Sequence, residues 1–226
     1  LRPSTWGRNK CLKIYVFLVP DGWSETWARA RLVYANTGLN LVPSGLLPTS
    51  QSPDNGGEVE DYKLPYHEYE VEEVTHSKAV VGQGYSLDIN VTVTNEGNYT
   101  ETFNTAAYAN TTSVASEIVT LPGNSSTTVS FVWNTAGYAK GNYTISAYAE
   151  PAPDEADTTD NTLIDGWVFI TIPGDINADQ RVNILDCIIL ANHFGHANGN
   201  SDINSDSKVN ILDCIILANN FGKKWP

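Results

Sequence analysis

The C-terminal part of the chain contains one stretch of sequence twice, DINADQRVNILDCIILANHFG at 175–195 and DINSDSKVNILDCIILANNFG at 202–222. The two copies differ at only four of 21 aligned positions and begin 27 residues apart. Each copy places Asp, Asn and Asp at alternate positions, Asn at the ninth position and Asp at the twelfth, within an apolar run. The duplication predicts two equivalent units, each a polar loop followed by a helix.

The oxygen-bearing side chains of each copy have the spacing of a calcium loop of the EF-hand kind. Asx-rich turns that cap two helices without metal are the alternative, because Asp and Asn are common in turns and caps. Two copies in register favour the metal, and we predict two Ca²⁺ ions. Arg181 and Lys208 would contribute backbone carbonyls. The predicted ligands are Asp175, Asn177, Asp179, Arg181, Asn183 and Asp186 in the first loop, and Asp202, Asn204, Asp206, Lys208, Asn210 and Asp213 in the second.

The sixth loop position departs from the EF-hand pattern. An EF-hand loop has Gly there, where the chain turns sharply, whereas this sequence has Gln180 and Ser207. A non-Gly residue in the left-handed conformation costs on the order of 1 kcal/mol, which the metal ligands can offset.

The predicted helix at 184–194 carries apolar residues around most of its circumference. A helix that is apolar nearly all round must be buried nearly all round. Two such helices in a domain of about fifty residues cannot cover every face against each other, so an apolar patch should remain. That patch would bind a partner or pack on a neighbouring domain of the same chain.

Residues 173–222 resemble a dockerin, the module that in cellulosomes attaches an enzyme to a cohesin receptor. The resemblance rests on both loops, both following helices and the lack of a helix before each loop. It implies a calcium-dependent fold and a cohesin-like partner. The positions just before the last ligand of each loop are where dockerin-like modules carry partner-selecting residues, and the resemblance places Ile184, Leu185, Ile211 and Leu212 there.

The three cysteines leave two alternatives open. Cys187 and Cys214 occupy equivalent helix positions, so pseudo-symmetry could bring them together as a disulfide. They could equally be two small apolar core residues, a common role for Cys. Cys11 would then be free, buried or paired with another chain.

Residues 68–173 alternate apolar and polar side chains in short runs separated by turn residues, which indicates an antiparallel β-sandwich of about seven strands. The segments LDINVTVTNEGNYTETF (87–103), LPGNSSTTVSFVW (121–133) and GNYTISAYAEPAPDEADTTDNTL (141–163) resemble a CARDB domain, an Ig-like module of prokaryotic surface proteins. The acidic loop at 150–160 would hold a further cation or simply be solvated.

Five Asn-x-Ser/Thr triplets fall in the same region and favour an extracellular, glycosylated protein. Asn90 and Asn142 alternate with apolar neighbours and should face outward. The predicted glycosylation sites are Asn90, Asn98, Asn110, Asn124 and Asn142.

The N-terminal segment ends in GEVEDY (57–62), preceded by ARARLVYANTGLNLVPSG (28–45). This combination resembles the closing part of a GEVED domain, a β-rich module of secreted and surface proteins. The upstream strands of that family would be missing here, and an incomplete domain could be completed by a neighbouring subunit. Such a head-to-tail contact makes a fibre if it does not close into a ring. The plain alternative is a fragment.

Composition and motifs restrict the function further. A net charge of −13 argues against nucleic acid, and residues 71–172 hold twelve acids with only Lys78 and Lys140 as bases. The most apolar run, 11–19, has nine residues and is too short to span a membrane. The sequence contains no HExxH, GxSxG, phosphate-binding Gly loop or CxxC. We therefore expect no enzyme.

The prediction is a mainly β chain of three domains: a partial GEVED-like β-rich domain at 1–67, a CARDB-like Ig-type sandwich at 68–173 and a dockerin-like helical module at 174–226. The favoured function is a calcium-stabilised, non-catalytic surface protein of a bacterium or archaeon, assembled head-to-tail with other copies of itself. The alternative is the C-terminal targeting part of a secreted enzyme that docks onto a cohesin.

Overall fold

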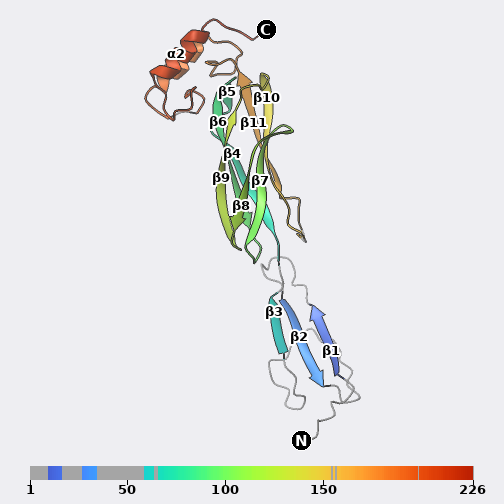
Figure 1. Cartoon of the computed structure of the whole chain (residues 1–226). Helices are drawn as coiled ribbons and strands as arrows, with labels where there is room; N and C mark the ends of the chain where they lie inside the picture. The colour runs from blue at the N-terminus through green and yellow to red at the C-terminus, as the bar shows by residue number, and fades with distance from the viewer. Residues whose placement is uncertain are drawn as a thin grey trace. The chain divides into compact units, whose positions relative to one another are not determined.

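The computed structural model divides the chain into two compact units, Leu1–Tyr66 and His67–Pro226. It describes residues 10–16, 27–34, 59–63, 66–153, 155, 157–197 and 199–225, with side chains described from residue 66 onward. In the first unit, β1 (Lys10–Val16), β2 (Trp27–Tyr34) and β3 (Val59–Lys63) form an antiparallel sheet in the order β1-β2-β3 (Figure 1).

The GEVED-like prediction falls only partly on described residues. Residues 57 and 58 of GEVEDY lie outside them, as do all of residues 35–58, and residues 59–62 belong to β3. Cys11 lies in β1, and the structure does not describe its side chain. The GEVED resemblance stays a prediction.

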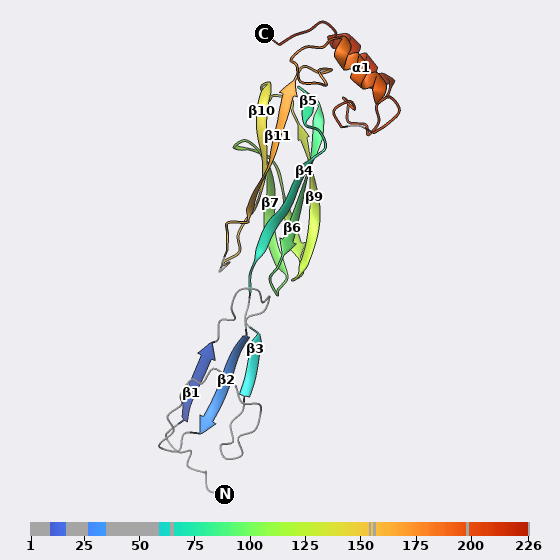
Figure 2. The ribbon, with the colours of Figure 1, turned by 180° about the vertical axis from the view of Figure 1, so that it is seen from behind.

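The second unit contains a sandwich of two sheets, seen from two sides in Figures 1 and 2. One sheet has the order β5-β11-β10-β7-β8 and the other β4-β6-β9. All pairs are antiparallel except β5 with β11, which are parallel. The bounds are β4 (Tyr69–His76), β5 (Val80–Gly82), β6 (Ser86–Asn95), β7 (Glu101–Ala109), β8 (Thr112–Leu121), β9 (Ser125–Asn134), β10 (Gly141–Ala149) and β11 (Thr162–Thr171).

The sandwich has eight strands, whereas the sequence predicts about seven, because β5 has only three residues and shows no alternation. The predicted alternation is present in β6, where every second residue from Leu87 to Val93 is at most 1% exposed. The core also holds Trp133, whose ring meets Tyr138 and Tyr143 edge-on at centroid distances of 5.2 and 5.6 Å. Burying each large apolar side chain contributes about 1.5–3 kcal/mol.

The C-terminal module consists of two loops, each followed by a helix, α1 (Ile184–Asn192) and α2 (Ile211–Asn220). Each loop pairs with the chain beyond the opposite helix. The Val182 N–H donates to the Lys223 carbonyl at 2.9 Å, and the Val209 N–H donates to the His196 carbonyl at 2.9 Å. The two copies therefore close on each other, over a small core of Ile172, Ile176, Val182, Leu190, Ile203, Val209 and Leu217.

The predicted fold class is confirmed: the chain is mainly β, with an Ig-like sandwich and a small helical module at its C-terminal end. Within the described ranges, the helices are too short for a membrane span.

Candidate metal centre and docking surface

Each loop gathers three carboxylates. Oxygens of Asp175, Asp179 and Asp186 lie within 4.8 Å of one another, and so do those of Asp202, Asp206 and Asp213. In each cluster the first and last carboxylates are buried and the middle one is exposed. Three negative charges at this distance repel each other strongly unless a cation lies between them. The donor set is oxygen only, which suits a hard cation such as Ca²⁺.

The twelfth residue of the first loop closes the loop and starts the helix. Oδ1 of Asp186 accepts the Ile176 N–H at 2.8 Å, and its Oδ2 accepts the Asn183 N–H at 2.9 Å. Asn183 in turn caps α1 by accepting the Leu185 N–H at 2.8 Å, which completes a capping box. One carboxylate thus ties the beginning of the loop, its end and the first helical turn together.

The second loop repeats this arrangement. Asp213 accepts the Ile203 N–H at 2.7 Å and the Asn210 N–H at 2.8 Å, and Asn210 caps α2. The first residues of the two loops, Asp175 and Asp202, likewise each accept the N–H groups four and five residues later, at 2.8 to 3.1 Å. The duplicated sequence therefore produces two equivalent sites.

The four predicted Asn ligands lie at the same clusters. Asn177 and Asn183 each donate Nδ2 to Asp179, at 3.3 and 3.1 Å, while Asn204 and Asn210 donate to Asp206 at 3.0 and 2.8 Å. The backbone N–H groups of residues 181 and 208 donate to the same middle carboxylates. All twelve predicted positions thus surround the two clusters, and their coordination of calcium stays a prediction.

Both loops contain left-handed residues. Gln180 and Ser207 have φ of 68° and 71° at the sixth position, the conformation that an EF-hand loop requires there. Ala178 and Ser205, at the fourth position, have φ of 61° and 63°, which the sequence did not lead us to expect. Each costs on the order of 1 kcal/mol relative to Gly. The loops are strained in a way that bound metal would offset.

Burial raises the pKa of Asp175 above its ordinary value, and the charge of Asp186 adds to this effect. The hydroxyl of Thr171, which donates to Asp175 at 2.5 Å, and the Gln180 N–H oppose it. Thr171 is the last residue of β11. The first loop is therefore bonded directly to the end of the sandwich.

Two family models match the chain. Residues 69–164 match CARDB, and residues 173–222 match the Dockerin type I domain. The chain carries a CARDB domain followed by a type I dockerin domain. Both are families of non-catalytic modules that are typical of extracellular or cell-surface proteins. Type I dockerin domains bind Ca²⁺, and the two carboxylate clusters could each hold one ion.

Solved structures with some likeness to the chain include the CARDB domain of the PF1109 protein from Pyrococcus furiosus in complex with di-metal ions. It is 21% identical with a TM-score of 0.42, and the match covers 47% of this chain and 96% of that one. A domain from a Methanosarcina acetivorans protein is 25% identical with a TM-score of 0.38, covering 46% and 92%. These overall likenesses add nothing to the family matches. No curated protein matches the sequence.

The second loop of the dockerin domain is held by Lys78, between β4 and β5 of the CARDB domain. Lys78 is buried, and its Nζ donates to the Asp202 carbonyl and to Ser205 Oγ, the latter at 2.8 Å. Ser205 Oγ donates in turn to the Ser86 carbonyl at 2.6 Å. Burial lowers the pKa of Lys78, while the negative charges of Asp202 and Asp213 oppose this effect.

Sequence reasoning missed the role of Lys78. The available signal was compositional, since Lys78 is one of two bases among twelve acids in residues 71–172. The turn before the second loop adds further contacts to the same strand connection. Asn200 Oδ1 accepts the N–H groups of Ala79 and Val80 at 3.0 and 3.1 Å. Gly199 lies so close to the Ser77 carbonyl that a Cβ there would overlap it.

The helices present an exposed apolar surface, which we call the docking face. Its side chains are 49% to 62% exposed, and equivalent residues of the two helices are exposed to nearly the same extent. The predicted apolar patch is therefore present, and the CARDB domain does not cover it. The docking face comprises Ile184, Leu185, Ile188, Ile211, Leu212 and Ile215.

A groove of about 490 Å³ runs between the helices, with Phe194 and Phe221 among its walls. Cys187 and Cys214 line it as half-buried free thiols. The structure therefore has no disulfide between Cys187 and Cys214, and both line the groove between the helices. Burial raises the pKa of the Cys214 thiol, and the nearby charge of Asp213 adds to the effect.

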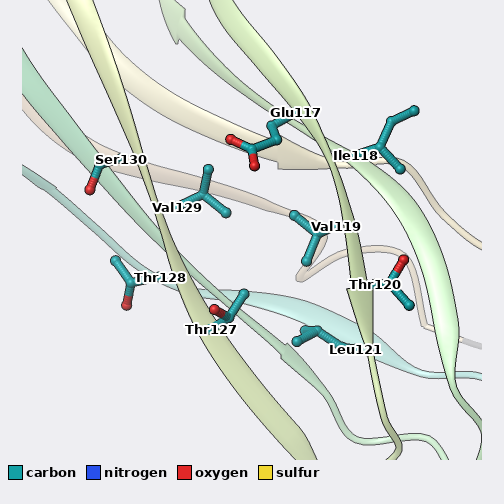
Figure 3. A pocket seen from close by; sticks show the side chains of 9 residues that line it. All are labelled: Glu117, Ile118, Val119, Thr120, Leu121, Thr127, Thr128, Val129 and Ser130. Carbon is teal, nitrogen blue, oxygen red and sulfur yellow. The ribbon is translucent and has the colours of Figure 1, made fainter.

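The CARDB domain has a shallow pocket of about 350 Å³ between β8 and β9 (Figure 3). Its side chains are Val, Thr, Ser, Ile and Leu, with Glu117 as the one titratable group among them. A lone carboxylate on this strand surface does not form the paired groups that acid–base catalysis needs.

The five predicted glycosylation sites all lie on the CARDB domain. Asn110, Asn124 and Asn142 are exposed, whereas Asn90 and Asn98 are half-buried. Asn90 Oδ1 accepts the Ser130 hydroxyl at 2.7 Å. Glycosylation stays a prediction at all five.

Proposed function

We propose that this chain is a calcium-dependent attachment protein of the cell exterior, whose dockerin domain docks onto a cohesin-type receptor while the CARDB domain acts as a spacer. The observation that carries the proposal is the docking face, six apolar side chains about half exposed on helices that begin inside the calcium loops. Exposed apolar patches of this kind mark binding sites in soluble proteins.

Calcium would neutralise the carboxylate clusters. The chain's own residues then do the rest: Asp186 and Asp213 hold the first turns of α1 and α2, and the second loop is seated on Lys78. The docking face is therefore rigid only when both loops are closed. Docking therefore depends on calcium even though the calcium-binding residues need not touch the partner.

The docking face consists of two equivalent halves. Ile184 and Ile211 are each 62% exposed, and Leu185 and Leu212 are 52% and 49% exposed. Because the halves carry the same residues, a partner that fits one also fits the other. A substitution on one helix alone therefore leaves an intact site, and a decisive variant must change both helices.

The proposal assigns no catalysis to the chain and is compatible with its being the targeting part of a larger secreted enzyme. Head-to-tail assembly with further copies is the second candidate. It is favoured by exposed apolar side chains on the sandwich, among them Ile118, Val132 and Ile164, each at least 65% exposed. These could receive the docking face of another copy.

The experiment measures binding of the intact chain to a panel of type I cohesin domains by surface plasmon resonance, with Ca²⁺ and with EDTA. We expect binding only in Ca²⁺. Leu185→Asp combined with Leu212→Asp should weaken it by about 30-fold or more, because the partner uses one half at a time and a buried interface anchor of this kind contributes about 2 kcal/mol or more. Ile118→Asp, on an exposed strand position, should leave the affinity unchanged.

Light scattering of the same samples separates the two candidates. Calcium-dependent polymers that capture no cohesin, and that Ile118→Asp dissolves, would support self-assembly and overturn cohesin docking.

A further inference from the structure

A third group of acidic side chains lies in the CARDB domain, where the loop before β11 meets the residue preceding β4. Glu68 is only 5% exposed. Its burial, together with the charges of Asp160 and Glu155, raises its pKa to about 7. Glu68 and Asp160 are 92 residues apart in the sequence, so folding brings these carboxylates together. Burying a carboxylate without a counter-charge costs several kcal/mol.

Three buried oxygens in this region have no hydrogen-bond partner: Oε1 of Glu68, Oδ1 of Asp160 and Oδ1 of Asn161. All three are acceptors, and Asn161 is fully buried. Among the charges that act on Glu68 within the described ranges, every one is negative. Native proteins rarely leave buried polar atoms unpaired, and buried acceptors of this kind need a water, a proton or a cation as partner.

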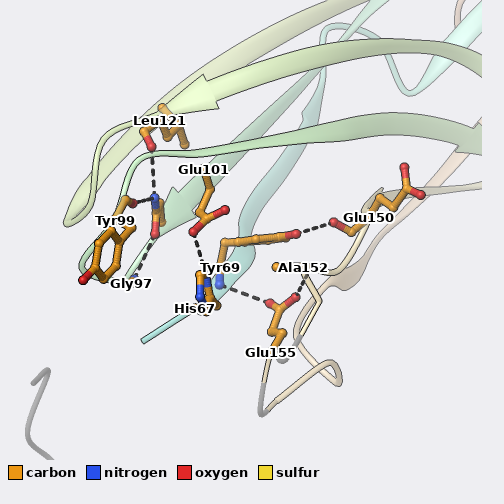
Figure 4. A network of polar contacts seen from close by, with 10 residues as sticks. His67, Tyr69, Gly97, Tyr99, Glu101, Leu121, Glu150, Ala152 and Glu155 are labelled. Carbon is orange, nitrogen blue, oxygen red and sulfur yellow. Dashed lines mark hydrogen bonds and ion pairs between the residues drawn. The ribbon is translucent and has the colours of Figure 1, made fainter. Parts of the chain in front are cut away.

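Figure 4 shows the neighbouring hydrogen bonds of Glu155 to Tyr69 and Ala152, which do not use these oxygens. Glu155 Oε1 accepts the Tyr69 N–H at 3.2 Å, and its Oε2 accepts the Ala152 N–H at 2.8 Å. Asn161 donates Nδ2 both to Glu155 Oε1 and to the Tyr69 carbonyl, each at 3.1 Å. Because its amide nitrogen is committed on both hydrogens, the amide oxygen is the end left for a ligand.

We propose that Glu68, Asp160 and Asn161 form a third calcium site, separate from the two dockerin loops. Two carboxylates and an amide oxygen are ligands that Ca²⁺ prefers, and no nitrogen or sulfur ligand takes part. The ion would join the start of β4 to the loop that leads into β11. It would therefore fasten the first strand of the CARDB domain, independently of what the dockerin domain binds.

A proton shared between Glu68 and Asp160 is the competing explanation, since it would also satisfy two of the three oxygens. It leaves Asn161 Oδ1 unpaired, whereas a cation uses all three. The two explanations make different predictions for Glu68→Gln, which keeps the shape of the side chain and removes its charge.

Isothermal titration calorimetry of the intact chain counts the bound Ca²⁺. We expect three ions for the unmodified chain and two for Glu68→Gln. Glu117→Gln, an exposed carboxylate on β8, is the matched control and should retain three. Two ions for both the unmodified chain and Glu68→Gln would overturn the proposal.

Thermal unfolding provides a second test that does not depend on counting. In EDTA, Glu68→Gln should melt at the same or a higher temperature than the unmodified chain, because it removes an uncompensated buried charge. In saturating Ca²⁺ it should melt at a lower temperature, because the ion is lost. An equal increase in both buffers would indicate the shared proton and overturn the site. Asp160→Ala should lose the same ion if Glu68→Gln does not fold.

Discussion

The substitution Asp186→Asn tests how the first loop works, because its two effects have opposite signs. In EDTA it removes two repulsive pairs, with Asp175 and Asp179, at distances within 4.8 Å. Each pair amounts to about 1 kcal/mol at the dielectric constant of water and about 3 kcal/mol at an effective value of about 20. It also replaces the oxygen that accepts the Asn183 N–H at 2.9 Å, a charge-assisted bond of about 1.5–3 kcal/mol.

At the dielectric constant of water these two effects cancel to within about 1 kcal/mol, whereas at an effective value of about 20 the relief of repulsion is larger by about 3 to 4.5 kcal/mol. The metal-free variant should therefore be about as stable as the unmodified chain, or more stable. Calcium changes the comparison. At 100 to 1,000 times the dissociation constant, a bound ion adds about 2.7 to 4.1 kcal/mol, which the variant should lose for its first loop.

The assay is urea unfolding in EDTA and in Ca²⁺, followed by circular dichroism at 222 nm. This signal reports α1 and α2, the helices of the described part of the chain. Asp165→Asn, a carboxylate of β11 that pairs with His76 away from the loops, is the control and should retain the full calcium-induced gain. A gain as large in Asp186→Asn as in the unmodified chain would refute the assignment of the loop.

Three further predictions concern the CARDB domain and its junction with the second loop. Lys78→Met removes the donor to the Asp202 carbonyl and keeps an unbranched side chain that is one atom shorter. It should lower the melting temperature of the dockerin helices and weaken calcium binding to the second loop, as measured by calorimetry. Gly199→Ala should also lower that melting temperature, because the added Cβ meets the Ser77 carbonyl. An unchanged melting temperature would show that the contacts between the CARDB domain and the second loop do not stabilise the helices. In EDTA, the raised pKa of Glu68 means that the folded state holds a proton which the unfolded chain has lost between pH 4.5 and about 7. The unfolding free energy should therefore fall as the pH rises through this window. In chemical denaturation, Glu68→Gln should lack this part of the pH dependence.

Sequence could predict the dockerin part well because its signals are local. The oxygens of one loop lie within twelve residues, the helix cap belongs to the same loop, and the duplication repeats both. The exposed docking face was also predictable, since helices apolar on nearly every side cannot cover each other completely. The alternation in β6 and its neighbours indicated the sandwich for the same local reason.

The contacts between distant segments were not predictable. Lys78 and Asp202 are 124 residues apart, and a single Lys gives no periodicity to interpret. Glu68 opens the Glu-rich stretch 68–73, and only the folded chain shows that it is buried near the loop at 150–160 while Glu72 and Glu73 are exposed. The cysteines illustrate the same limit, because equal positions in two helices permit either a disulfide or apolar packing.

Amide hydrogen exchange of the intact chain in Ca²⁺ and in EDTA tests the central claim most directly, namely that calcium fixes the helices that carry the docking face. The account predicts strong protection of residues 184–192 and 211–220 in Ca²⁺ and its loss in EDTA, while β6 and β9 remain protected in both. Equal protection of the two helices with and without calcium would contradict it.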